Sequence, residues 1–195
     1  MLRPNPVMAT EIGCYAAAMF GRRKPPQEPN STPPNAFAGL RAQALQATPE
    51  LAGLSSVPDA RVIYGALLDW ALDEGGVATV FTLQDGTASL YLSSGGGIIG
   101  GGFHEPVRIA VRGFLLAFEP FLDTMLPDSD DAPPPSGYTD LRALTTRGRL
   151  VVRASTDDFG KRRHPMSDVF HAGQTVITAL RQLEPTGREL RPNST

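Results

Sequence analysis

The chain has 195 residues, a formal net charge of −2 and 41% hydrophobic residues. This length fits one domain with tails better than two domains, and the apolar content is enough for a core. The near balance of charge argues against a nucleic-acid binder, which needs a strong basic field. The single cysteine excludes an intramolecular disulfide and a cysteine-based zinc site. It fits a reducing compartment, so we expect a cytoplasmic protein.

No apolar run approaches the roughly 20 residues that span a bilayer, so we expect no membrane insertion. The apolar stretch 7–20 (VMATEIGCYAAAMF) is interrupted by Glu11. Its basic cluster follows it, whereas a signal peptide carries positive charge before its apolar core. Three methionines are alternative starts of the chain: Met1, Met8 and Met19.

A polar, proline-rich stretch precedes the predicted domain. Residues 22–35 (RRKPPQEPNSTPPN) offer few backbone donors and almost nothing to bury. We therefore expect residues 1–35 to be a disordered tail that is dispensable for folding. A single domain is predicted over residues 36–184, followed by a polar tail over 185–195.

The first half of this domain predicts a short helix and three strands. A helix is expected over 36–47, where it stops before Thr48-Pro49. Residues 61–70 (RVIYGALLDW) fit either a strand or a helix, and the β-branched and aromatic residues favour a buried strand. Asp85-Gly86 then joins strands 77–83 and 87–93 in a hairpin.

The second half begins with a glycine run over 95–102 and a long helix over 104–125, in which Pro120 predicts a kink. A second hairpin is expected from strands 138–145 and 149–155. A loop over 156–166 and an amphipathic helix over 168–183 follow. The order α-β-β-β-α-β-β-α predicts an α+β fold with two layers, in which helices cover one face of a mainly antiparallel sheet of about five strands.

Two motifs carry a resemblance. They are DGTASLYLSSGGGIIGGG at 85–102 and RHPMSDVFHAGQTVITALR at 163–181. The stretch from Tyr64 to Leu183 resembles a family of uncharacterised bacterial proteins, for which the resemblance implies no activity and no catalytic residues. The element order is also loosely similar to the roadblock and profilin-like folds, which often serve as interaction modules. An extra first strand departs from the roadblock pattern.

The glycine run is the most informative feature of the sequence. Gly95, Gly97 and Gly100 match a G-x-G-x-x-G pattern between a strand and a helix, where backbone N–H groups can hold a phosphate. The preceding element is a hairpin rather than a βαβ unit, no P-loop lysine follows, and Glu105 would repel an anion. The simpler interpretation is a tight strand-to-helix connection. A flexible lid is a third interpretation.

Other candidate groups form no coherent catalytic constellation. The three histidines, His104, His164 and His171, match no metal-ligand spacing, so we predict no metal site and no cofactor. The basic triplet 161–163 predicts a solvated loop, with contact to phosphate or an acidic partner as the alternative. Any ligand-binding site is predicted to comprise Gly95, Gly96, Gly97, Gly100, His104, Arg163 and His164.

The long helix carries a wide apolar arc beside a narrow polar stripe that runs from Glu105 to Asp123. A single sheet face covers only part of such an arc, so an interface is predicted at Phe114, Phe118 and Phe121. The cover is the first or last helix of the same chain, or else a second subunit or partner protein. We therefore expect a non-catalytic interaction or assembly module. The alternative is a small-ligand or nucleotide-binding protein, with or without enzymatic activity, that uses the glycine run.

Overall fold

The computed structural model describes residues 34–56, 60–73 and 75–183. The predicted tails lie outside these residues, except that Pro34 and Asn35 belong to the first helix. The elements follow in the order α1 (Pro34–Leu45), β1 (Ile63–Ala71), β2 (Val77–Leu83), β3 (Ala88–Leu92), β4 (Gly97–Ile98), the 3-10 turn η1 (Gly101–Phe103), α2 (Glu105–Phe118), the 3-10 turn η2 (Glu119–Phe121), β5 (Leu126–Pro127), β6 (Tyr138–Thr145), β7 (Gly148–Ser155), α3 (Thr156–Gly160) and α4 (Ser167–Arg181).

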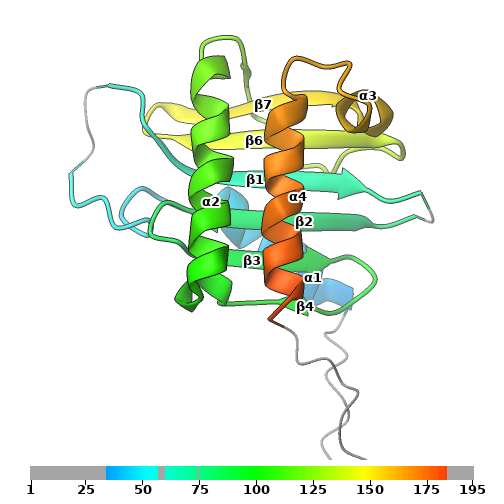
Figure 1. Ribbon diagram of the computed structural model, residues 1–195, viewed down its shortest axis with the longest axis horizontal. Coiled ribbons are helices and arrows are strands. Elements are labelled where there is room, and N and C mark those ends of the chain that lie inside the picture. Colours follow the sequence, from blue (N-terminus) through cyan, green and yellow to red (C-terminus); the bar gives the residue numbers. More distant parts are fainter. Residues whose placement is uncertain (1–33, 57–59, 74, 184–195) are drawn as a thin grey trace, which may run out of the picture.

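The strands form one antiparallel sheet in the order β4-β3-β2-β1-β6-β7-β5 (Figure 1). The predicted α+β class and the antiparallel sheet are confirmed, and residues 61–70 do contain a strand, β1. The sheet has seven strands rather than about five. The two extra strands, β4 and β5, are two-residue pieces at the edges, too short to show a period in the sequence.

Helices cover both faces of the sheet, which corrects the expected two layers to three. The helices α2 and α4 pack on one face, and α1 lies on the other (Figure 1). The reason is the composition of β1, which is buried almost throughout. Ala66 and Leu68 face α2 and α4, whereas Tyr64 and Leu67 face α1. A strand that is apolar on both sides needs cover on both sides.

Close approach of α4 to the sheet depends on Gly173. A Cβ at this position would lie 2.5 Å from Leu68 Cδ1 and 3.1 Å from the Phe114 ring. The helix therefore packs directly on β1 and on α2. Together these elements enclose the larger of two cores, and α1 closes the smaller one on the far side.

Two local predictions are wrong. The long helix does not kink at Pro120 but ends at Phe118, and a 3-10 turn follows. Proline has no N–H to continue the α-helical ladder, so the chain tightens and stops there. The expected loop after β7 contains the short helix α3, whose Phe159 is fully buried. Within the described residues, no helix has the length and apolarity needed to cross a membrane.

Candidate functional site

A network of buried charges lies on the α1 side of the sheet. Its centre is Asp69 of β1, whose side chain is 0% exposed. Its carboxylate accepts hydrogen bonds from Arg41 of α1, with Nε 3.0 Å from Oδ1 and Nη2 2.7 Å from Oδ2. Arg142 of β6 donates from Nη1 to Oδ2 at 2.5 Å, and the Thr79 hydroxyl donates to Oδ1. The network consists of Arg41, Asp69, Asp128, Asp140, Arg142, Arg149 and Arg153.

Arg142 joins the carboxylates of this network to one another. Besides Asp69, it reaches Asp128 through Nε at 3.0 Å and Asp140 through Nη2 at 2.8 Å. Asp140 also accepts two hydrogen bonds from Arg153, at 2.6 and 2.8 Å. These bonds raise the pKa of Arg153 above its ordinary value, so this guanidinium stays charged. Paired charges of this kind tolerate burial because every polar atom finds a partner.

Arginines of this network also bind the segment 128–137, here called the strap, which connects β5 to β6. Asp128 accepts from Arg142 and from Arg149, whose Nε lies 3.2 Å away. Arg149 also pairs with Asp131 at 2.6 Å. Carbonyl oxygens of the strap accept from Arg41 and Arg142. The strap is therefore fixed by side chains from α1, β6 and β7.

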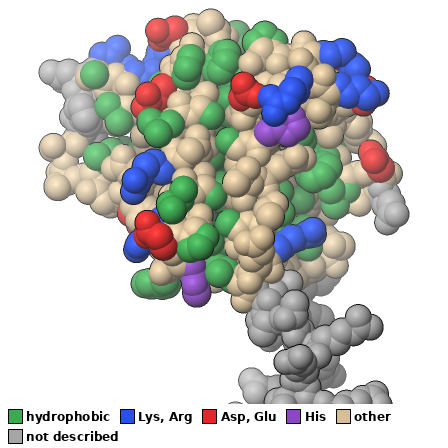
Figure 2. Space-filling model, in the orientation of Figure 1, with side chains coloured by type: hydrophobic (Ala, Val, Ile, Leu, Met, Phe, Trp, Pro, Cys, Tyr) green, Lys and Arg blue, Asp and Glu red, His purple; other side chains and the backbone are tan. Residues whose placement is uncertain are grey.

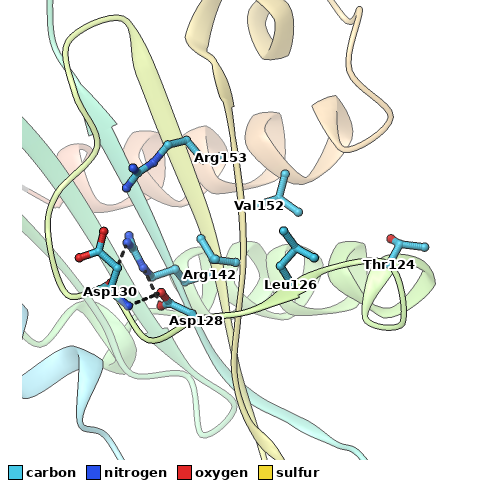
Figure 3. A pocket seen from close by; sticks show the side chains of 8 residues that line it. Thr124, Leu126, Asp128, Asp130, Arg142, Val152 and Arg153 are labelled. Carbon is cyan, nitrogen blue, oxygen red and sulfur yellow. Dashed lines mark hydrogen bonds and ion pairs between the residues drawn. The ribbon is translucent and has the colours of Figure 1, made fainter.

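Between the strap and the sheet edge lies a hollow of about 510 Å³. Figure 3 shows Val152 and Leu126 on one side of it, with Asp128, Asp130 and Arg142 on the other. Its lining residues are Thr124, Leu126, Asp128, Asp130, Arg142, Val151, Val152 and Arg153. The side chains around the hollow are thus mixed, with apolar walls next to paired charges.

The hollow opens beside a sheet edge that has no neighbouring strand. The short β5 pairs with β7 only at Leu150 and Val151. Beyond Val151, no described strand lies beside β7, so residues 152–155 form an open edge. Leu126, at the end of β5, is 69% exposed. An open edge next to a partly apolar hollow can bind a segment in extended conformation.

The predicted ligand-binding residues do not form one site. The glycine run lies next to the last turn of α4, where Leu180 would contact a Cβ at Gly101. Arg163 and His164 precede Ser167, where α4 begins. The two groups are therefore separated by the length of α4, about 20 Å at 1.5 Å per residue, and lie at opposite ends of the sheet (Figure 1).

The glycine run itself has the geometry of a tight connection. A Cβ at Gly97 would lie 2.3 Å from the carbonyl oxygen of Leu90. Gly95, Gly96 and Gly100 have φ values of 100°, 82° and 81°, in the left-handed region that favours glycine. His104 is exposed at the start of α2, and Glu105 pairs with Arg108.

At the other end, the basic triplet is matched by neighbouring carboxylates. Arg163 contacts Asp157 and Asp158, and Lys161 contacts Asp157. The hydrogen bonds from Lys161 and Arg163 hold the pKa of Asp157 below its ordinary value. His164 accepts a hydrogen bond from the Met166 N–H at Nδ1 and packs against Phe159. These contacts stabilise the turn between α3 and α4.

The three phenylalanines of the predicted interface pack within the chain. Phe114 and Phe118 are fully buried, and the half-buried Phe121 packs against the same core. The last helix, α4, provides the cover that the wide apolar arc requires. On the outer side of α2, Ile109 and Leu116 are exposed. Hydrophobic side chains on this face are scattered among charged ones (Figure 2).

The charge network was not predicted from the sequence, although it leaves a trace there. Asp140 and Arg142 alternate with apolar residues in β6, and Arg149 and Arg153 lie four residues apart in β7, so that each pair shares a face of its strand. Charges two residues apart in a strand point to the same face. An aspartate inside the apolar run of β1, Asp69, completes the pattern. Together these signals are typical of charged side chains that share one covered face of a sheet.

Comparison of the chain with protein-family models, curated proteins and solved structures found no significant match in any of the three. The resemblances drawn from the two sequence motifs and from the element order therefore stay predictions. Within the described residues, no group of three or more His, Cys, Asp or Glu side chains is placed to hold a metal ion. Within the part of the chain that the structure describes, the hollow beside the open edge of β7 is a candidate binding site.

Proposed function

We propose that the protein is a non-catalytic interaction module that binds an extended segment of a partner protein along the open edge of β7. The observation that supports this most directly is the end of the pairing between β5 and β7 at Val151, beside the hollow. An added strand gains main-chain hydrogen bonds from such an edge, and a neighbouring pocket selects a side chain.

The register of the sheet indicates which backbone groups are available. Leu126 of β5 lies opposite Val151, and residues two apart along a strand direct their backbone groups to the same side. Arg153 and Ser155 therefore present their N–H groups toward the open edge. The chain of β5 cannot continue beside them, because Thr124 and Met125 turn back to bond the Phe121 carbonyl.

The hollow fits an apolar side chain of the bound segment. Leu126, Val151 and Val152 provide its apolar walls, and about 510 Å³ lies within the range of about 300–1,000 Å³ that is typical of ligand pockets. At its margin, Asp130 exposes a carboxylate, whereas Arg153 is paired with Asp140. This arrangement favours a segment with an apolar residue flanked by a basic one.

The charge network makes this surface rigid before any partner arrives. Arg142 holds β6 to β1 and to the strap, and Arg153 holds β7 to Asp140. A preformed edge does not need to be ordered on binding, so less conformational entropy is lost.

Binding is tested with displayed random peptides of about ten residues, selected against the full chain. Ser155→Pro removes one edge N–H, and its backbone φ of −55° already suits proline. The matched control Ser155→Ala keeps this N–H. We expect selected peptides to lose about fivefold in affinity with the proline variant, the worth of one hydrogen bond, and to keep their affinity for the alanine variant.

Amide chemical shifts give the second readout. Bound peptides are expected to perturb residues 150–156 and 124–128 most. If the strongest perturbations lie elsewhere, or if both variants bind peptides equally well, the proposal is wrong. A small molecule that perturbs the same residues, while no peptide does, would favour the ligand-binding alternative instead.

A further inference from the structure

Two large apolar side chains are exposed at the opposite edge of the sheet, next to β4. Phe103 is 91% exposed and Ile99 is 68% exposed. They lie at either end of the short segment that links β4 to α2, and no described strand lies beyond β4. We call Ile99, Phe103 and the free side of β4 the β4 patch. An unpaired sheet edge with exposed apolar side chains is a surface that a further segment can cover.

Both ends of the described chain lie at this edge of the molecule. The helix α1 packs beside β3 and begins near β4, and α4 ends there (Figure 1). Leu183 Cδ1 would lie 3.6 Å from a Cβ at Gly101. Residues 1–33 and 184–195 therefore both connect to the domain close to the β4 patch.

Only one of these two terminal segments has the composition to cover an apolar surface. Residues 184–195 (EPTGRELRPNST) are polar apart from a single leucine. Residues 7–20 (VMATEIGCYAAAMF) are mostly apolar and carry two aromatic side chains, Tyr15 and Phe20. Between them and α1 lies the polar, proline-rich segment 21–33, which reaches about 43 Å when extended. This length is sufficient for residues 7–20 to reach the β4 patch, because α1 begins near β4.

We propose that residues 7–20 dock on the β4 patch of the same chain and cover Ile99 and Phe103, with residues 21–33 as the tether. This proposal limits the disorder expected of residues 1–35 to the polar, proline-rich part and the first few residues. The tether makes the contact intramolecular, so even a modest intrinsic affinity is sufficient for a high occupancy. This contact lies at the edge opposite to the hollow, and it is independent of the function proposed above.

The native Cys14 provides the test, because it is the single cysteine of the chain and lies inside the proposed docking segment. In the full chain, His104→Cys places a thiol next to Phe103 while leaving the patch intact. Ser94→Cys places one at the exposed turn between β3 and β4 as a control. A tail that moves freely meets both positions, whereas a docked segment favours the first.

Under mild oxidation of dilute protein, the rate of intrachain disulfide formation is divided by the rate at which each new thiol reacts with oxidised glutathione when Cys14 is replaced by serine, because a thiol at the N-cap of α2 has its own reactivity. We expect this normalised rate to be at least ~5-fold higher with His104→Cys than with Ser94→Cys, because docking raises the local thiol concentration. Adding Ile99→Ser and Phe103→Ser should abolish the preference. Equal rates, a faster reaction of Ser94→Cys, or disulfides between chains alone would each overturn the proposal, and the last result would instead indicate a second copy as the occupant.

A measurement without new cysteines gives an independent check. Docking should slow hydrogen exchange at residues 98–103, and Tyr15→Ser with Phe20→Ser should restore fast exchange there while leaving β1 protected. No difference in exchange between this variant and the native chain would contradict the docking.

Discussion

Asp69 on β1 and Arg142 on β6 form an ion pair between neighbouring strands, with Nη1 2.5 Å from Oδ2. The two residues lie diagonally, since Asp69 is opposite Asp140 and Arg142 is opposite Leu67. Their side chains are 0% and 1% exposed. A pair buried this deeply is tolerated only because each group has further partners.

Removing Asp69 should therefore be strongly destabilising. In Asp69→Ala, Arg41 and Arg142 lose a shared carboxylate and remain buried, which is expected to cost about 3–5 kcal/mol of the free energy of unfolding. Urea denaturation measures this loss. The control is Asp123→Ala, which removes an ion pair with Arg61. The Asp123 carboxylate is exposed to solvent, so this change should cost less than about 1 kcal/mol. Equal losses would contradict a central role for Asp69.

The strap should loosen when Asp128 is neutralised. Asp128→Asn weakens the contacts to Arg142 and Arg149, while the backbone bond from Asp128 N–H to the Arg149 carbonyl stays. We expect faster hydrogen exchange at residues 129–132, with little change in α2. The matched control is Asp130→Asn, because Asp130 is exposed and forms no ion pair with Arg142 or Arg149. The asparagine oxygen can still accept the hydrogen bond from the Ala132 N–H, so exchange should stay unaltered.

The glycine run offers a graded test of the tight connection. Gly97→Ala should destabilise most, because its Cβ would lie 2.3 Å from a backbone oxygen. Gly100→Ala has free space but a φ of 81°, so we expect a loss of about 1–2 kcal/mol. Gly113→Ala, inside α2 with open space around it, should stabilise by up to about 1 kcal/mol. Thermal unfolding of the three variants checks this order, and tolerance of alanine at Gly97 would refute it.

The two sides of α2 should respond differently to truncation. Phe114→Ala empties a fully buried site between the sheet and α4 and is expected to cost about 3–5 kcal/mol. Leu116→Ala, at a position 54% exposed, should cost less than about 1 kcal/mol in a monomer. A large loss at Leu116 that depends on protein concentration would show that the outer side of α2 is covered by a second subunit.

The strands and long helices could be predicted because their local signals agree with their tertiary role. Asp85-Gly86 has the turn chemistry that the β2–β3 hairpin uses, with Asp85 accepting from the Thr87 N–H. The apolar faces of α2 and α4 follow the helical period. The short strands β4 and β5 follow no such pattern, because their place at the edges comes from pairing with β3 and β7.

The candidate site was harder to predict because it depends on contacts between distant residues. Arg41 and Asp69 belong to different elements, and the sequence gives no sign that α1 lies on the far face of the sheet. Lys161 to Arg163 attracts attention as a basic triplet, yet nearby aspartates match its charge. The open edge beside the hollow exists because β5 begins only at Leu126. The residues before it, Thr124 and Met125, belong to the turn after α2.

The charge network also bears on how the chain folds. Its members come from α1, β1, the strap, β6 and β7, so it joins residues as far apart in the sequence as Arg41 and Arg153. A partly folded state with the sheet formed but α1 detached would leave Asp69 without Arg41 and would expose the smaller core, including Leu67, Phe81 and Leu144, to water. We expect such a state to be too costly to accumulate, so that α1 docks in the same cooperative step that joins β1 to β6.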